Sequence, residues 1–225
     1  MPTAYQQKSI AAKNNILKKL NKEVAGADYT KLPDEPGYQY PQLSPTEQLT
    51  QFITHLQANH AQVIKIAKVD IAKVVSEQLK QRDITTLLHG KDATFSAQLA
   101  EIDDNVKREV YDFDLQENKD KLFNDTPAGI TNSCAAIAAT GTIVLWPTVE
   151  EPRALSLVPP VHFVIVDANK LYSTFASLIT AQQWQDKLPT NIVLVSGPSK
   201  TADIQQTLAY GAHGPKELIV LLLNT

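Results

Sequence analysis

Cysteine is almost missing from this chain of 225 residues, in which Cys134 is the single example. One thiol excludes an intramolecular disulfide, because that bond joins two cysteines. It also excludes an iron–sulfur cluster held by this chain alone, because such a cluster needs about four thiolates. We therefore expect no disulfide and no cluster bound by this chain by itself.

Long apolar runs and blocks of one charge are also missing. No run approaches the roughly 18 residues that span a bilayer, and residues 1–8 lack the apolar core of a signal peptide. We therefore expect no membrane span and a cytoplasmic location. The formal net charge is -3, and no block of lysines or arginines interrupts the chain. We expect no nucleic-acid partner, since such proteins usually carry a basic patch.

The sequence also lacks the familiar catalytic motifs. The sequence has no nucleophile elbow, no Walker motif and no dinucleotide-binding glycine fingerprint. Cys134, His162 and His213 contain no close-spaced ligand pair, so we predict no metal site. These absences leave the catalytic residues, if there are any, unassigned.

The chain does have a rhythm of apolar strands and amphipathic helices. Ser44, Pro45 and Glu47 form a capping box that starts a helix. Residues 130–145 indicate two strands meeting at a sharp turn around Gly141. Further strands are predicted at 62–66, 85–88, 107–111, 161–166, 191–195 and 217–223, and further helices at 70–79, 93–104, 115–123, 153–157, 170–185 and 200–210. This order predicts an α/β fold with an open, mostly parallel sheet flanked by helices.

The N-terminal part differs in composition from the rest of the chain. Residues 4–24 predict a helix whose apolar stripe is too thin for a core helix. Residues 25–44 contain three prolines and three tyrosines. They indicate either an extended arm, which wraps its own domain or a neighbouring subunit, or a partly disordered lead-in. We therefore divide the chain into an arm at 1–44 and an α/β domain at 45–225.

The turn at residues 196–203 carries the strongest local signal for a ligand. A predicted buried strand ends at Gly197, and the predicted helix begins two or three residues later. Free N–H groups at a helix start, together with Ser199, Lys200 and Thr201, suit phosphate or carboxylate. The alternative is an ordinary helix start with Asp203 in its first turn.

The Thr140-Gly141-Thr142 triplet and Arg153 are further candidates. The triplet indicates either close backbone and hydroxyl contact with a ligand or a tight turn packed under a helix. Arg153 suits a bidentate clamp on a carboxylate, or an ion pair with Glu150 or Glu151 at the surface.

Two histidines complete the candidate set. His162 begins a predicted central strand, and His213 lies between Gly211 and Gly214. Each is either a general base or ligand contact, or a hydrogen-bonded structural histidine.

Four motifs in order resemble the LUD domain, the family of lactate-utilisation protein C. They are Gly129 to Leu145, Pro152 to His162, Ser196 to Ile204 and Gly211 to Pro215, and the likeness covers about residues 45–225. The resemblance implies a fold like that of the sugar-phosphate isomerase and coenzyme A transferase group. It also implies a cytoplasmic system that oxidises L-lactate to pyruvate, with iron–sulfur clusters on partner subunits.

One departure from the family pattern concerns catalysis. Members often carry an acidic residue directly before Thr-Gly-Thr, where this chain has Ala139. Two functions stay open. One is a lactate-utilisation subunit that binds a small anion, either alone or as a homo-oligomer. The other is a stand-alone binding protein or enzyme for a phosphorylated or acyl metabolite.

Overall fold

A computed structural model describes residues 4–26, 40–91, 94–114, 118–188, 190–202, 208–211 and 213–223. The chain divides into two units, Met1–Tyr40 and Pro41–Thr225. Within the first unit, helix α1 (Ala4–Val24) has the predicted bounds. Its apolar residues are exposed, including Ile16 and Leu20, as a thin stripe predicts. Most of the predicted arm, with Tyr29 and Tyr38, lies outside the described residues, so the role given to 1–44 stays a prediction.

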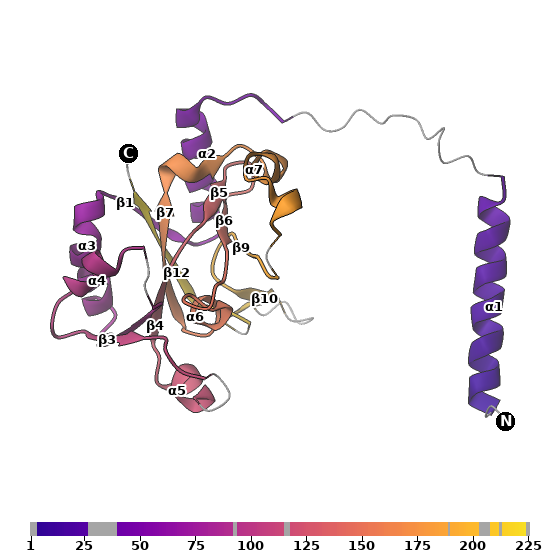
Figure 1. Cartoon of the computed structure of the whole chain (residues 1–225), viewed down its shortest axis with the longest axis horizontal. Helices are drawn as coiled ribbons and strands as arrows, with labels where there is room; N and C mark the ends of the chain where they lie inside the picture. The colour runs from indigo at the N-terminus through magenta and orange to yellow at the C-terminus, as the bar shows by residue number, and fades with distance from the viewer. Residues whose placement is uncertain are drawn as a thin grey trace. The chain divides into compact units, whose positions relative to one another are not determined.

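A parallel sheet of six strands forms the centre of the second unit (Figure 1). Its strands, in spatial order, are β1 (Gln62–Ile66), β12 (Glu217–Leu223), β7 (Val161–Asp167), β4 (Ala128–Asn132), β2 (Thr86–His89) and β3 (Lys107–Val110). Every neighbouring pair among them is parallel. The predicted open, mostly parallel sheet is therefore confirmed.

Both faces of this sheet are buried, which explains why its central strands are apolar almost throughout. Along β7, Phe163 and Ile165 face one hydrophobic cluster, whereas Val164 and Val166 face another. The first cluster lies under α3 (Ile71–Lys80) and α4 (Ser96–Ala100). The second lies under α2 (Pro45–Ala58) and a second sheet (Figure 1).

The second sheet is mixed and has four strands. They are, in spatial order, β8 (Leu171–Tyr172), β5 (Ala135–Ile137), β6 (Thr142–Leu145) and β9 (Val193–Val195). Strands β5 and β6 are the two strands predicted around Gly141, whose φ is +59°, and the structure pairs them antiparallel. The remaining helices are α5 (Lys119–Asn124), α6 (Arg153–Leu157) and α7 (Phe175–Ala181).

The capping box at the start of α2 is confirmed. The side chain of Ser44 accepts the N–H of Glu47, and the Glu47 carboxylate accepts the N–H of Ser44. No helix in the described ranges is long and apolar enough to cross a membrane.

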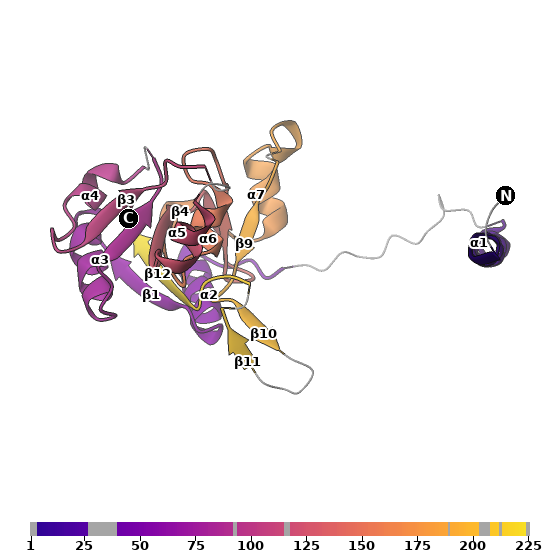
Figure 2. The ribbon, with the colours of Figure 1, turned by 90° about the horizontal axis from the view of Figure 1, so that it is seen from below.

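The prediction of a helix at 200–210 is wrong. Its ends form an antiparallel hairpin of β10 (Lys200–Ala202) and β11 (Leu208–Tyr210), which projects from the domain (Figure 2). Gly211 is not a helix cap: it has φ +82° and donates its N–H to the Ser199 carbonyl at the base of the hairpin. Short polar segments of this kind carry too little periodicity to separate helix from hairpin.

Two predicted elements in the second half have different bounds. The single helix expected at 170–185 is instead α7, flanked by β8 and a 3-10 turn at Trp184–Asp186. The strand expected at 191–195 is β9, which pairs antiparallel with β6 instead of joining the parallel sheet. Leu194 is 50% exposed there, so β9 is not a fully buried strand.

Candidate functional site

A pocket of about 460 Å³ lies where the carboxyl ends of the parallel strands meet. Asn132 ends β4, Lys91 follows β2, and Lys170 follows β7. Cys134 and Glu151 also line this cavity, which we call the Glu151 pocket. In open α/β sheets the carboxyl edge is where ligands usually bind.

Two hydrogen bonds from Asn132 hold the Glu151 carboxylate. The backbone N–H of Asn132 donates to Oε2 at 3.1 Å, and its side-chain amide donates to Oε1 at 2.7 Å. Burial raises the pKa of Glu151, and these hydrogen bonds partly offset the rise. A carboxylate has about four acceptor positions, so it keeps capacity for a ligand.

The loop that carries Glu151 docks closely on the end of β2. The Thr148 hydroxyl accepts the N–H groups of Glu150 and Glu151, and the Lys91 N–H donates to the Glu150 carbonyl at 2.9 Å. A Cβ at Gly90 would lie 2.7 Å from that carbonyl oxygen, so only glycine allows this approach. The loop is thereby held over the strand ends.

The other polar groups of the Glu151 pocket have distinct properties. Burial raises the pKa of the Cys134 thiol to about 11, so the sulfur is protonated at neutral pH and is a poor nucleophile. Lys91 Nζ lies 3.2 Å from the Asp112 carboxylate, at the surface. Lys170 is exposed. The pocket therefore combines two ammonium groups with a half-buried carboxyl group.

A second cavity, of about 230 Å³, lies at the opposite, amino edge of the sheet. It brings together four predicted ligand contacts: Gly197, Ser199, His162 and His213. We call it the His162 pocket. His162 is 1% exposed, and its Nε2 lies 2.8 Å from Thr131 Oγ1. Burial lowers the pKa of His162 to about 3, so the ring is neutral at physiological pH.

The Thr140-Gly141-Thr142 triplet serves mainly as a packed turn. A Cβ at Gly141 would strike the Cβ of His55 in α2 and lie 3.1 Å from the Leu56 nitrogen. The hydroxyl of Thr142 lies 2.7 Å from that of Thr140 and 2.8 Å from that of Ser196. The triplet thus connects to the His162 pocket through Ser196, which lines it.

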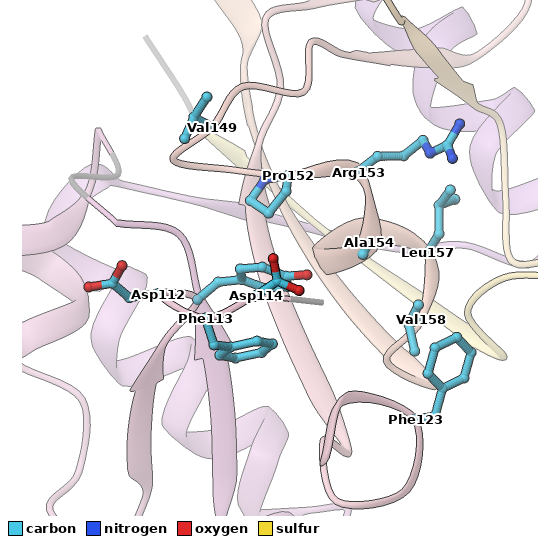
Figure 3. Close-up of a pocket in the computed structure, with 11 residues that line it drawn as sticks. Asp112, Phe113, Asp114, Phe123, Val149, Pro152, Arg153, Ala154, Leu157 and Val158 are labelled. Carbon is cyan, nitrogen blue, oxygen red and sulfur yellow. The ribbon is translucent and has the colours of Figure 1, made fainter. Parts of the chain in front are cut away.

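Arg153 lines a third and larger pocket of about 820 Å³, the Arg153 pocket (Figure 3). Its wall is mostly apolar, and the carboxylates of Asp112 and Asp114 share it. In Figure 3 the Arg153 guanidinium and the Asp112 carboxylate lie at opposite sides. No ion pair joins Arg153 to Glu150 or Glu151 in the described ranges. The two carboxylates outnumber the single guanidinium, which disfavours an anion in this pocket.

The predicted helix start is wrong, because Lys200 and Thr201 belong to β10. Anion binding by these two residues stays a prediction. Lys200 is exposed and is not among the described residues that line the Glu151, His162 or Arg153 pocket. Without a helix, the first-turn N–H groups that favour an anion are missing at this position.

Sequence reasoning missed the main polar groups of the Glu151 pocket, which are Lys91, Asn132, Glu151 and Lys170. They come from four separate segments, and each looks like an ordinary surface residue in its own context. For Lys91 and Lys170 the available signal was their position after the strands predicted at 85–88 and 161–166, since carboxyl ends of parallel strands share an edge. Asn132 and Glu151 carried no such signal. Within the described ranges, no group of three or more His, Cys, Asp or Glu side chains is placed to hold a metal ion.

Comparisons with known proteins identify the family. A sequence model of the LUD domain matches residues 49–223. The chain is 35% identical to "Uncharacterized protein NMB1437" of Neisseria meningitidis serogroup B, over 95% of this chain and 94% of that protein. It is 25% identical to "Lactate utilization protein C 1" of Bacillus mycoides, over 81% of each chain.

A solved structure supports the fold. A DUF162 family protein from Deinococcus radiodurans matches with a TM-score of 0.61 at 20% identity, over 81% of this chain and 100% of that one. Such low identity shows the architecture alone. Since the family match covers most of the sequence, the chain belongs to the LUD domain family.

Proposed function

We propose that this protein is a subunit of a lactate-utilisation system and that its Glu151 pocket binds a small hydroxy acid such as L-lactate. The names of curated relatives, among them "Lactate utilization protein C" of Bacillus subtilis at 32% identity over 51% of this chain, support the system. The combination of Lys91, Lys170 and Glu151 in one pocket is the observation that supports the ligand.

The chemistry of a hydroxy acid matches this combination. Its carboxylate needs a cationic donor, and Lys170 and Lys91 each supply an ammonium group. Its hydroxyl needs an acceptor, and Glu151 keeps acceptor capacity beyond the two bonds from Asn132. The formal charges of the two lysines and of Glu150 and Glu151 balance. This balance favours a ligand with one carboxylate and one hydroxyl group over a polyanion.

Oxidation of L-lactate to pyruvate releases two electrons and two protons. Cys134 is the only cysteine, so this chain cannot hold an iron–sulfur cluster alone. We therefore propose that iron–sulfur subunits accept the electrons and that this chain contributes ligand binding. The alternative of a protein for a phosphorylated or acyl metabolite has less support, because it relied on a helix start at 200, where the described residues 200–202 form a strand.

The cationic part of the site is tested with Lys170→Gln and a matched control, Lys73→Gln on the exposed side of α3. We expect Lys170→Gln to weaken L-lactate binding by about threefold to tenfold, since one exposed charge-assisted contact is lost. Lys73→Gln makes the same charge change away from the pocket and leaves the affinity unchanged. Isothermal titration of full-length protein measures both. Equal affinities in the two variants would contradict the assigned pocket.

The acceptor role of Glu151 is tested with Glu151→Ala and two ligands. Propionate has the carbon chain and carboxylate of lactate but no hydroxyl. We expect the variant to bind L-lactate about tenfold more weakly while its affinity for propionate changes little, because the one ligand contact that Glu151 makes is with the hydroxyl group. If both affinities fall equally, Glu151 does not read the hydroxyl.

The cellular role needs a separate measurement. Deletion of the gene is expected to abolish growth on L-lactate, and wild-type protein is expected to co-purify with a cysteine-rich subunit. Restoration of growth by Lys73→Gln but reduced growth with Lys170→Gln would link the pocket to the system. Normal growth of the deletion strain on L-lactate would contradict the proposal.

A further inference from the structure

His162 leaves one buried nitrogen without a partner. Nε2 pairs with Thr131, whereas Nδ1 has no hydrogen bond to any described residue. Leaving a buried polar atom unpaired costs about 1–3 kcal/mol, and the large majority of such atoms are paired. His162 is one of the residues that line the His162 pocket, so this cavity is the nearest described space from which a molecule could pair with Nδ1.

Among the described residues that line the His162 pocket there is no Lys, Arg, Asp or Glu. Hydroxyl groups come from Ser156, Ser196 and Ser199, and aliphatic surface comes from Val193, Val195 and Leu218. The His162 ring is neutral, so it does not offset the charge of a carboxylate or phosphate. This lining suits an uncharged polar molecule, because an anion would lose its hydration without gaining a cation.

We propose that the His162 pocket is a second binding site, which takes a small uncharged molecule carrying a hydroxyl group. A neutral imidazole carries its proton on one of the two ring nitrogens, so Nδ1 is an acceptor in one tautomer and a donor in the other. A hydroxyl group satisfies both forms, because it donates to the first and accepts from the second. The cavity of about 230 Å³ is smaller than typical pockets for drug-sized ligands, so the ligand is small.

This site is distinct from the Glu151 pocket. His162 is the second residue of β7, at the amino edge of the sheet, whereas Lys170 follows the carboxyl end of the same strand. The two cavities have no lining residue in common. Binding at one can therefore be measured independently of binding at the other.

Two probes with the same three-carbon skeleton test the assignment. One is 1,2-propanediol, which is uncharged and has hydroxyl groups; the other is L-lactate, which carries a carboxylate. Full-length protein labelled with ¹⁵N-histidine is titrated with each probe by NMR. We expect 1,2-propanediol to shift the Nδ1 resonance of His162 saturably, and L-lactate to leave it unshifted at the same concentrations.

Three variants locate the binding. Leu194→Trp narrows the pocket from a position that is 50% exposed, so it preserves both the fold and the reporter ring. We expect it to weaken 1,2-propanediol binding by at least about tenfold. His162→Phe, measured by calorimetry, is expected to weaken it by about tenfold, through loss of one hydrogen bond. Lys170→Gln is expected to leave it unchanged.

The opposite results overturn the proposal. If 1,2-propanediol produces no saturable shift, an ordered water satisfies Nδ1 and the pocket is not a site for this class. If binding survives unchanged in both Leu194→Trp and His162→Phe, the molecule binds elsewhere. Because Lys170→Gln affects L-lactate alone, failure of this inference and failure of the proposed function give different results.

Discussion

His162 is hydrogen-bonded to Thr131 and Glu151 to Asn132, and burial shifts the pKa values of the two groups in opposite directions. Burial disfavours the charged form of each group. It therefore lowers the pKa of the histidine, to about 3, and raises the pKa of the glutamate. His162 is neutral at physiological pH, so it can only exchange hydrogen bonds there. The carboxyl group of Glu151 is the better candidate for exchanging a proton with a ligand.

The ionisation of His162 predicts a pH dependence of stability. Its pKa is about 3 in the folded protein and near 6.5 in the unfolded chain. Unfolding therefore takes up a proton at any pH between these two values. The contribution of His162 to the free energy of unfolding is complete above pH 6.5 and is lost as the pH falls towards 3. Replacement by Gln removes this titration.

We expect the free energy of unfolding of the wild type to fall more steeply between pH 6.5 and pH 4.5 than that of His162→Gln. The extra slope is about 1 kcal/mol per pH unit, since one pKa unit corresponds to about 1.4 kcal/mol. Urea denaturation at several pH values measures it. Because acidic groups titrate in both proteins, the difference between the two curves isolates His162. Parallel curves would show that the folded protein does not exclude the imidazolium.

At the scale of elements, the turn between β5 and β6 decides how the second sheet packs on α2. Gly141 has a positive φ, and His55 and Leu56 of α2 approach it closely. A side chain there meets both backbone strain and a steric clash. The triplet around Gly141 is therefore explained by packing, with its hydroxyls extending towards Ser196.

Gly141→Ala is expected to destabilise the protein by about 2–3 kcal/mol, from the φ preference and the contact with α2 together. Gly214→Ala is the control, because its Cβ would meet Ser199 Cβ at 3.2 Å, a tight contact without a clash into α2. Thermal unfolding followed by circular dichroism compares the two. An equal loss in both variants would show that the α2 contact contributes little.

Elements with strong local signals were predictable, and those set by long-range pairing were not. The capping box fixes the start of α2, and the apolar runs at β7 and β12 indicate buried parallel strands. By contrast, residues 200–202 and 208–210 form strands because they pair with each other, which no local periodicity reveals. The helix start expected within the turn at 196–203 was wrong for the same reason.

At the scale of the whole molecule, the described members of the hydrophobic clusters belong to the second unit. Their first residue in chain order is Leu49. In the described ranges, the apolar side chains of α1 stay exposed. The described part of the second unit therefore has a hydrophobic core of its own.

Removal of residues 1–40 is expected to leave the Tm of the remaining domain and its affinity for L-lactate unchanged. A change in mass by light scattering would assign the N-terminal unit to homo-oligomer assembly, and an unchanged mass would reject that role. Loss of folding in the truncated protein would contradict the separation into two units.

The sequence alone determined the fold class, because periodic apolar runs report local structure, and ordered motifs determined the family. It also pointed to His162, His213, Gly197 and Ser199, which lie around one pocket. Only the tertiary structure decided that Lys91, Asn132, Glu151 and Lys170 meet at the carboxyl edge of the sheet. Their separate segments converge through strand order and loop docking, and the burial that raises the pKa of Glu151 arises from that packing.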